Sequence, residues 1–526
     1  MRLHHQIEIM DTTLRDGEQT SGVSFLPSEK LQIAKLLLEE LKVDRIEVAS
    51  ARVSEGELEG VKKITHWATE KGYLDRVEVL GFVDTPASVD WLVEAGAKVL
   101  NLLTKGSLNH LVHQLKKTPE RHFADIKKCI DYARQKGIAV NVYLEDWSSG
   151  MRNSKEYTLS LIDFLKDQQV ERIMLPDTLG ILKPEEVATF IAEVHATFPK
   201  VHFDFHAHND YDLSVANVLE AVKNGVKGVH STINGLGERA GNAPLESVAA
   251  ALSDFTSTKL NIQENKIYRV SKLVEQFSGL HIPSNKPVVG ENVFTQTAGI
   301  HADGDNKKNL YFNDLLPERF GRTRKYALGK TSGKANILKN LMELGISLEP
   351  DELTKVTQKI IELGDRKERV TTEDLPYIIS DVLQNNSIRK DISIEGYHMT
   401  HSKGLKPTVQ LKLNILGSSY EAHASGNGQF DSFMLAVQEI YQTLGKKLPK
   451  LTDFSVSIPP GGKTDAFVET VITWDYGRII KTKGLDSDQT VAAMMATEKM
   501  LNIIEQITLG TTENTNHGNE YRTAAR

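Results

Sequence analysis

The stretch Ile7-Glu-Ile-Met-Asp-Thr-Thr-Leu-Arg-Asp-Gly17 sets the interpretation of the first half of this sequence. It begins as a short apolar strand and ends with two acids and an arginine in front of a glycine. Residues 202–210, His-Phe-Asp-Phe-His-Ala-His-Asn-Asp, repeat the arrangement with two histidines at the end of a strand pattern. Residues at i and i+2 of a strand point to one face, so we expect the imidazoles of His206 and His208 to lie together.

Eight runs with the composition of strands occur before residue 234, and each is followed by a stretch long enough for a helix. After the first run, Pro27-Ser28-Glu29 predicts a helix start with Ser28 as the N-cap. Eight βα units in about 250 residues are typical of one α/β fold, the (β/α)8 TIM barrel. The predicted strands are Ile7–Met10, Arg45–Ala49, Val77–Phe82, Val99–Leu103, Ala139–Leu144, Arg172–Leu175, His202–His206 and Val226–Ile233.

Polar or charged residues follow seven of these eight strands. For any one of them, the alternative explanation is an ordinary polar residue in a turn. In a barrel, however, all the strand ends meet at one face, and that face carries the active site. The residues concerned are Arg15 and Asp16, Ser50, Asn101 and Thr104, Glu145 and Asp146, Asp177 and Thr178, His206 and His208, and Asn234 and Glu238.

The pattern changes twice after the barrel. Helical stretches first surround a Gly- and Lys-rich segment, 299–334, which indicates an arm or linker. Beyond about residue 390 the sequence is strand-rich and repeats itself: Thr408–Ile415 leads to a helix over 432–444, and Phe467–Thr473 leads to one over 490–503. This repeat predicts an α+β domain of two βββα units. The predicted domains are 1–265, a catalytic barrel; 266–388, a helical linker or arm; 389–508, the two-unit domain; and 509–526, a polar disordered tail.

Composition narrows the class of protein. At 526 residues the chain exceeds one hydrophobic core, so two or three domains are expected. A net charge of −7 disfavours binding to nucleic acid or to an anionic membrane. The single cysteine, Cys129, excludes an intramolecular disulfide and a thiolate zinc cluster. With no apolar signal core and no run of about 20 apolar residues, we expect a cytoplasmic protein.

One carboxylate and two imidazoles could form a divalent metal site. Asp16 ends the first strand, which neighbours the eighth in a closed barrel, so it can reach the end of strand seven. Such a donor set leaves positions open for substrate and suits Mg²⁺, Mn²⁺ or Zn²⁺. Asn242, after the eighth strand, could add an oxygen ligand. The alternative is that His206 and His208 are hydrogen-bonded core histidines.

Three motifs resemble those of the DRE-TIM metallolyase superfamily: Asp11-Thr-Thr-Leu-Arg-Asp-Gly17, His206-Ala-His-Asn-Asp210 and Gly235-Leu-Gly-Glu-Arg-Ala-Gly-Asn242. Within it, nearly the whole chain resembles the acyl-CoA-condensing 2-isopropylmalate, homocitrate and citramalate synthases. The segments 102–107 and 140–149 are most similar to the citramalate-forming members. One departure is Asp210-Tyr-Asp-Leu, where many relatives have Asp-x-Gly-Leu, which affects a loop but no expected ligand.

The resemblance implies a role for each site residue. Arg15 and Thr178 contact a 2-oxo acid, and Glu145 lies beside the reacting carbons. His301 and Tyr311 come from the arm, often that of a partner subunit, and His301 belongs to the base system. The cosubstrate is acetyl-CoA, the assembly a homodimer, and the C-terminal domain resembles an amino-acid-sensing module. The implied ligands of the metal (Zn, Mn or Mg) are Asp16, His206, His208 and Asn242.

The choice of 2-oxo acid depends on the size of the pocket. Leu80, Leu103 and Tyr143 lie near the ends of strands three, four and five, where they leave room for a methyl group and crowd an isopropyl group. This predicts pyruvate as the substrate and (R)-citramalate as the product, with isoleucine as the feedback inhibitor. The alternative is 2-oxoisovalerate, with isopropylmalate as product and leucine as inhibitor. The three residues could also be ordinary barrel core.

Two other classes of function stay open at this point. The barrel could be a catalytically silent metabolite sensor, although the intact Arg15, Asp16, His206 and His208 argue against it. The repeated C-terminal units could serve dimerisation alone rather than regulation.

Overall fold

The computed structural model describes residues 6–305, 307, 310–344, 346–365, 370–383, 391–457, 468–477 and 479–520. It divides into two compact units, which are described separately. The first unit comprises residues 1–296 and 307–325, and the second comprises 297–306 and 326–526.

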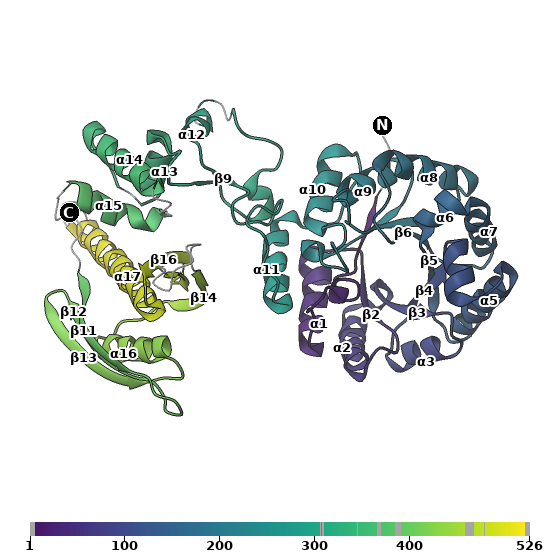
Figure 1. Ribbon diagram of the computed structural model, residues 1–526, viewed down its shortest axis with the longest axis horizontal. Helices are drawn as coiled ribbons and strands as arrows, with labels where there is room; N and C mark the ends of the chain where they lie inside the picture. The colour runs from purple at the N-terminus through teal and green to yellow at the C-terminus, as the bar shows by residue number, and fades with distance from the viewer. Residues whose placement is uncertain are drawn as a thin grey trace, which may run out of the picture. The chain divides into compact units, whose positions relative to one another are not determined.

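The first unit contains a closed barrel of eight parallel strands in chain order, as the sequence predicted (Figure 1). Strand β1 pairs with both β2 and β8, which closes the barrel. Predicted and observed strand ends agree within two residues for all eight strands, and the last strand is two residues shorter at each end than predicted. The strands are β1 (Glu8–Asp11), β2 (Arg45–Ser50), β3 (Val77–Phe82), β4 (Val99–Lys105), β5 (Ala139–Glu145), β6 (Ile173–Asp177), β7 (Phe203–Ala207) and β8 (Gly228–Ser231).

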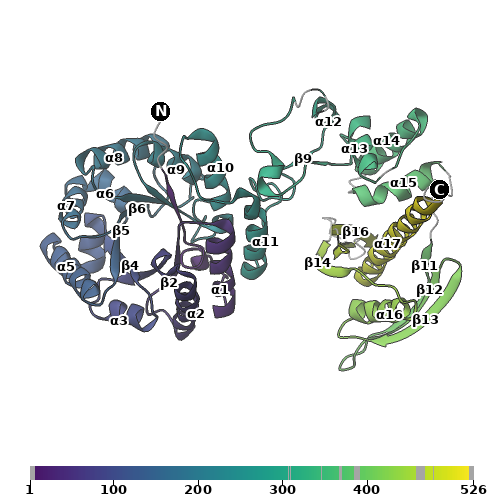
Figure 2. The same ribbon diagram turned by 180° about the vertical axis from the view of Figure 1, so that it is seen from behind.

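Helices surround the barrel, as both ribbon views show (Figures 1 and 2). Helix α2 is representative: Ser54 caps its first turn by accepting a hydrogen bond from the Glu57 backbone amide at 3.1 Å. Its buried face packs into the core that the whole unit shares, and Gly72 ends it in a left-handed conformation. The helices are α1 (Pro27–Lys35), α2 (Glu55–Lys71), α3 (Ala87–Glu94), α4 (Leu108–His110), α5 (Pro119–Gln135), α6 (Trp147–Asn153), α7 (Lys155–Lys166), α8 (Pro184–Thr197), α9 (Ser214–Lys223), α10 (Leu245–Phe255) and α11 (Ile267–Ser278).

A segment of short elements and helices follows the barrel. The elements are β9 (Thr295–Gln296), α12 (Gly299–Asp305), β10 (Lys325–Tyr326), α13 (Lys334–Leu344), α14 (Pro350–Asp365) and α15 (Leu375–Leu383). Helices α13, α14 and α15 share a small apolar core that includes Ile337, Val356 and Leu375. The helical character predicted for this part of the chain is therefore present.

The C-terminal part consists of two three-stranded antiparallel sheets, each followed by a helix, as the repeat predicted. In β12, the alternate residues Val409, Leu411 and Leu413 are buried, and they join residues of both halves in one core. Residue Phe467, which the sequence placed in a strand, lies outside the described residues. The elements are β11 (Ile392–Thr400), β12 (Thr408–Ile415), β13 (Ser418–Ser425), α16 (Gln429–Thr443), β14 (Lys450–Ser457), β15 (Val468–Asp475), β16 (Ile479–Asp486) and α17 (Gln489–Glu520).

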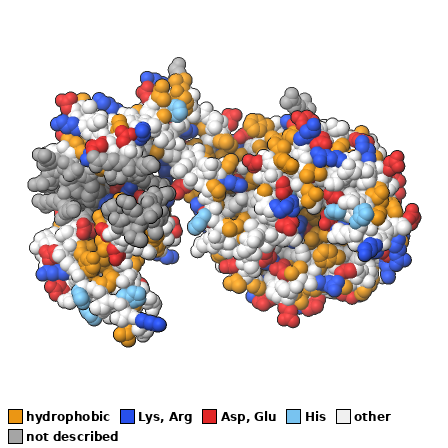
Figure 3. Space-filling view, in the orientation of Figure 1, with side chains coloured by type: hydrophobic (Ala, Val, Ile, Leu, Met, Phe, Trp, Pro, Cys, Tyr) orange, Lys and Arg blue, Asp and Glu red, His pale blue; other side chains and the backbone are white. Residues whose placement is uncertain are grey.

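The last helix, α17, runs to Glu520 and so enters the segment 509–526, for which the sequence predicted a disordered tail. On the face seen in Figure 3, acidic and basic side chains are interspersed over the barrel. Among the described residues, no helix has the length and apolar character that crossing a membrane requires.

Candidate metal centre

Asp16, His206 and His208 meet at the end of the barrel where the strands finish. Asp16 follows β1, His206 lies in β7, and His208 comes directly after β7. The Nε2 atoms of His206 and His208 lie 3.1 Å and 3.9 Å from Oδ2 of Asp16. One potential ligand atom from each residue falls within 4.8 Å of the others, and all three side chains are buried. The geometry brings together the three residues that the sequence selected.

Several polar atoms of this group accept or donate no hydrogen bond among the described residues, although Arg15 and the two imidazoles lie close to the Asp16 carboxylate. Both carboxylate oxygens of Asp16, and Nδ1 of both histidines, are buried without a hydrogen bond from the described residues. Buried polar atoms normally have a partner, so this group is poorly satisfied without a bound cation. It also does not fit the alternative of two hydrogen-bonded core histidines. A carboxylate with two imidazoles is a suitable donor set for a divalent metal.

The protonation states of these groups suit a cation. Burial raises the pKa of the Asp16 carboxyl, but the Arg15 guanidinium and the two imidazoles outweigh burial and hold that pKa well below its usual range. Burial and the neighbouring His206 lower the pKa of His208 to about 4. Near neutral pH the site therefore offers an ionised carboxylate and a neutral imidazole, the forms that bind metals.

Asn242 lies beside this cluster. Its backbone forms an isolated antiparallel bridge with His208, and its side chain is buried. Its Nδ2 donates to the Leu236 carbonyl at 3.0 Å, while Oδ1 has no partner among the described residues. An amide oxygen left free in this position is consistent with the predicted fourth ligand.

Glu47 fixes Arg15, and the sequence analysis did not select it. Arg15 lies 3.3 Å from Asp16 and donates through Nε to the fully buried carboxylate of Glu47 in β2. Asn101 in β4 donates to the other oxygen of Glu47 at 2.7 Å. An acid within the otherwise apolar run Ile46-Glu-Val48 was the signal that could have identified it.

Tyr143 contributes more than apolar volume. Its ring stands edge-on to His206, with ring centroids 6.1 Å apart, and Nη2 of Arg15 lies 3.4 Å from its hydroxyl. The hydroxyl is also 3.0 Å from Nδ1 of His230 in β8, a residue that the sequence analysis did not select. Burial, with the nearby Glu47 carboxylate, raises the pKa of Tyr143 well above its ordinary value, so the hydroxyl keeps its proton.

The three predicted pocket residues do gather in one place. Leu80 and Tyr143 belong to a separate apolar cluster inside the barrel, together with Met10 and Met174, and Leu103 packs against it. These side chains come from five strands and lie on the inside of the barrel, near Arg15. The cluster gives the site an apolar wall, although the same packing also serves the barrel core.

Glu145 and Thr178 lie at the ends of β5 and β6 and have protein partners. Glu145 forms an ion pair with Lys105, a buried lysine that the sequence analysis did not select. The Thr178 hydroxyl accepts a hydrogen bond from the Asp146 backbone amide at 2.8 Å. Both residues are partly exposed and are therefore accessible at this end of the barrel.

His301 and Tyr311, the residues expected from the arm, lie in the segment after the barrel. His301 is half-buried in α12 within the second unit, and Tyr311 is exposed within the first. Their participation in the site stays a prediction.

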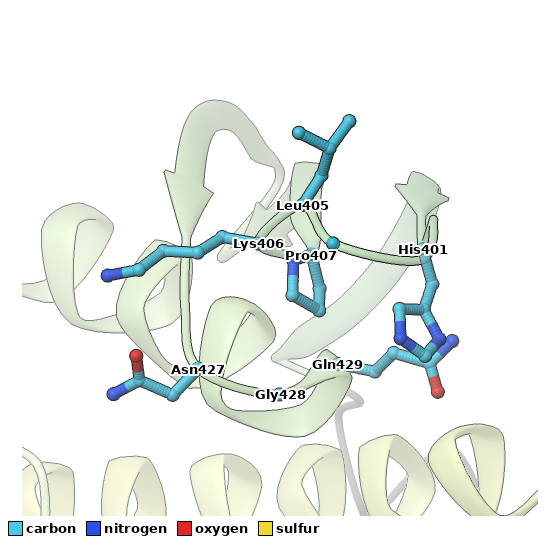
Figure 4. A pocket seen from close by; sticks show the side chains of 8 residues that line it. His401, Leu405, Lys406, Pro407, Asn427, Gly428 and Gln429 are labelled. Atoms are coloured by element: carbon cyan, nitrogen blue, oxygen red, sulfur yellow. The ribbon is translucent and has the colours of Figure 1, made fainter.

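The C-terminal domain has an open pocket of about 500 Å³ (Figure 4). Lys406 and Asn427 lie on one side of the view, and His401 and Gln429 on the other. Gly428 caps helix α16 at the pocket wall. The pocket is polar and lies apart from the shared apolar core of this domain.

Residues 6–274 match the HMGL-like family, residues 288–368 match the homocitrate synthase post-HMGL domain-like family, and residues 369–505 match the LeuA allosteric (dimerisation) domain. The barrel and its site thus define an HMGL-like protein with a LeuA-type C-terminal domain.

Two relatives from Methanocaldococcus jannaschii are similar over nearly the whole chain. A 2-isopropylmalate synthase is 34% identical over 504 residues, covering 94% of each chain. An (R)-citramalate synthase is 32% identical over 502 residues, covering 95% of this chain and 99% of the relative. The chain belongs to the HMGL-like family, in the group that contains these two kinds of synthase.

Proposed function

We propose that this protein is an acyltransferase that condenses acetyl-CoA with a 2-oxo acid and water, releasing CoA. The cluster of Asp16, His206 and His208 beside Arg15 carries this proposal. It places the ligand types that a divalent metal prefers next to the positively charged guanidinium of Arg15, at the end of the barrel. Both named relatives are synthases of the kind expected from this reaction.

Asp16, His206, His208 and Asn242 would hold a divalent metal, Zn, Mn or Mg. When bound, the metal supplies Lewis-acid polarisation of a carbonyl. The oxygens of Asp16 and Asn242 that accept no hydrogen bond from the described residues support this assignment.

Arg15 would bind the 2-oxo acid and stabilise negative charge that develops on its keto oxygen. Its guanidinium is held by Glu47, so it is oriented before the substrate arrives. The Thr178 hydroxyl, which directly follows β6, would bind the same substrate from the side opposite Arg15. Glu145 would lie beside the reacting carbons.

Removal of a proton from the acetyl methyl group needs a base. His301 is our candidate, because an imidazole can be tuned to titrate near neutral pH, and Tyr311 would assist it. The carbanion equivalent then forms the new bond to C2 of the 2-oxo acid. Water cleaves the thioester, and CoA leaves as the free thiol.

We infer that pyruvate is the 2-oxo acid and (R)-citramalate the product, the first step of a threonine-independent route to isoleucine. The apolar cluster around Leu80, Leu103 and Tyr143 supports the smaller substrate, because a branched side chain would have to displace packed groups. The second candidate is 2-isopropylmalate synthase acting on 2-oxoisovalerate, which the equal similarity to a 2-isopropylmalate synthase favours.

The C-terminal domain would make the enzyme a feedback-regulated homodimer. The match to a LeuA allosteric (dimerisation) domain supports both parts of this proposal. The effector would be isoleucine if citramalate is the product, and leucine if isopropylmalate is.

Release of free thiol from acetyl-CoA tests the proposed reaction. We expect release only with a 2-oxo acid and a divalent metal present, and at least about 100-fold less with Asp16→Asn, which removes a ligand charge. The exposed Asp163→Asn, in a surface ion pair with Lys166, is the matched control. Thiol release that needs no 2-oxo acid, or an active Asp16→Asn enzyme, would refute the proposal.

A further inference from the structure

We propose that His230 is a positioning residue that fixes the Tyr143 hydroxyl and thereby the size selectivity of the 2-oxo acid pocket. The inference rests on the proposed condensation for its kinetic test, and on geometry alone for a second, spectroscopic test. It begins from a line of hydrogen bonds that crosses the barrel interior.

Three strands contribute to this line. Tyr143 comes from β5, His230 from β8 and Asp204 from β7. Nδ1 of His230 lies 3.0 Å from the Tyr143 hydroxyl, and its Nε2 lies 3.1 Å from Oδ2 of Asp204. All three residues are buried. Both ring nitrogens of His230 are therefore engaged, so the imidazole has no nitrogen left for a metal or a substrate.

The far end of the line is firmly held. Asp204 receives a charge-assisted hydrogen bond from Arg45, and Arg45 also donates to Glu78 at 2.9 Å. His202 lies 3.0 Å from the other oxygen of Asp204. Because these groups hold the Asp204 carboxylate in place, Asp204 can orient the His230 ring through its contact with Nε2.

The chemistry of the partners gives the line a direction. A carboxylate can only accept, so Nε2 of His230 carries the proton and donates to Asp204. In a neutral imidazole Nδ1 then accepts, so Tyr143 donates its hydroxyl proton to His230. The lone pairs of the Tyr143 oxygen are left to face Arg15, 3.4 Å away.

This direction has a consequence for the pocket. With its hydroxyl committed to His230, the Tyr143 ring cannot swing away, and it stays packed against Leu80 and Met174. A rigid pocket wall discriminates between substrates by size better than a flexible one. Binding of the larger substrate then costs the free energy of displacing packed side chains. His230 thus acts on the substrate only through Tyr143.

Two isosteric variants separate this role from a merely structural one. Asn places a polar atom near Nδ1 of the histidine that it replaces, and Gln places one near Nε2. His230→Asn therefore keeps a partner for Tyr143 and loses Asp204, whereas His230→Gln keeps Asp204 and loses Tyr143. Tyr143→Phe removes the same hydrogen bond from the other side.

The readout is the ratio of kcat/KM for pyruvate to kcat/KM for 2-oxobutanoate, which is one methylene larger. We expect His230→Gln and Tyr143→Phe to lower this ratio by about fivefold to tenfold, the value of one lost hydrogen bond. His230→Asn should keep the ratio within about twofold. In the double variant, adding His230→Gln to Tyr143→Phe should lower the ratio no further than Tyr143→Phe alone does.

Three results would overturn the inference: equal ratios in the Gln and Asn variants, an additive double variant, or a Tyr143→Phe ratio equal to that of the unmodified chain. If the Gln variant does not fold, the comparison of His230→Asn with Tyr143→Phe still decides. Absence of thiol release from the unmodified chain with every 2-oxo acid would instead refute the proposed function.

Imidazole ¹⁵N NMR of the full chain tests the geometry without turnover. We expect His230 to show a protonated Nε2 and an unprotonated, hydrogen-bond-accepting Nδ1, and the Nδ1 resonance should shift in Tyr143→Phe. A proton on Nδ1, or a resonance that Tyr143→Phe leaves in place, would overturn the inference.

Discussion

At the scale of single residues, the chemistry of this barrel depends on pairs that fix one another. Asp16 faces two histidines, and Arg15 is held between Asp16 and Glu47. A guanidinium held in place before substrate binds loses no orientation during the reaction, which is why such preorganisation is effective. Substitution of a residue that holds a reacting group in place, such as Glu47, should therefore change the kinetics as substitution of the reacting group itself does.

Glu47→Gln should weaken the hold on Arg15 while leaving the side-chain shape unchanged. We expect the KM for the 2-oxo acid to rise and kcat/KM to fall by about 10-fold to 100-fold, since a charge-assisted bond of about 1.5–3 kcal/mol is lost. The exposed Glu94→Gln, in a surface ion pair with Lys62, is the control. Unchanged steady-state kinetics in Glu47→Gln would show that Arg15 needs no such support.

Asp11 should make stability depend on pH. Burial raises the pKa of this carboxyl to about 7, against two opposing hydrogen bonds from Thr13. The folded state therefore favours the protonated form, so the contribution of Asp11 to stability is fully present below about pH 4 and is lost as pH rises towards 7, by up to about 4 kcal/mol. Asp11→Asn should remove this loss.

Denaturant unfolding of Asp11→Asn and of the unmodified chain at pH 4.5 and pH 7.5 measures this difference. The exposed Asp163→Asn serves as the control. The assignment would be contradicted if the free energies of unfolding of Asp11→Asn and of the unmodified chain differed by the same amount at both pH values.

The residue scale also marks where sequence reasoning stops. The i, i+2 spacing and the strand ends were enough to select Asp16, His206 and His208. His230 was missed because it lies inside a strand, and its importance comes from Tyr143 and Asp204, 87 and 26 residues away in sequence. Periodicity identifies which face of a strand is buried, but not which polar groups meet inside a closed barrel.

At the scale of elements, the order and type of the strands were predictable, and helix ends were less so. Ser28 was expected to cap the first helix, but α1 begins at Pro27 and its N-cap is Leu26. The proline takes the first helical position, which its fixed φ favours, and Glu29 accepts the Leu26 backbone amide at 2.8 Å. Ser28 therefore lies within the first turn.

Paired alanine variants test this difference between helix starts. Ser54→Ala removes a true N-cap from α2 and should cost about 1 kcal/mol of stability. Ser28→Ala should change stability by less than about 0.5 kcal/mol, since its side chain is exposed and caps nothing. Thermal unfolding of both variants provides the comparison, and a larger loss for Ser28→Ala would reverse it.

At the scale of the whole molecule, the chain joins a barrel to a two-unit C-terminal domain, and the sequence repeat was sufficient to predict the latter. The apolar core of that domain contains residues of both βββα repeats, so neither repeat is expected to fold without the other. The placement of the arm residues His301 and Tyr311 does not follow from local pattern, because it depends on how separate parts of an assembly come together.

Feedback inhibition should depend on the C-terminal domain. We expect isoleucine to inhibit the full chain strongly and valine to inhibit it only weakly, and neither amino acid to affect a chain ending near residue 390. Initial rates of thiol release across a range of each amino acid measure this. Inhibition that survives in the shortened chain would place the effector site elsewhere.

The ratio of kcat/KM for pyruvate to kcat/KM for 2-oxoisovalerate tests the central claim most directly. If the apolar cluster of Leu80, Leu103 and Tyr143 sets the pocket size, the ratio should exceed about 10, since two extra methyl groups must enter a packed wall. A ratio of one or less would contradict the small-pocket account and favour 2-isopropylmalate synthesis.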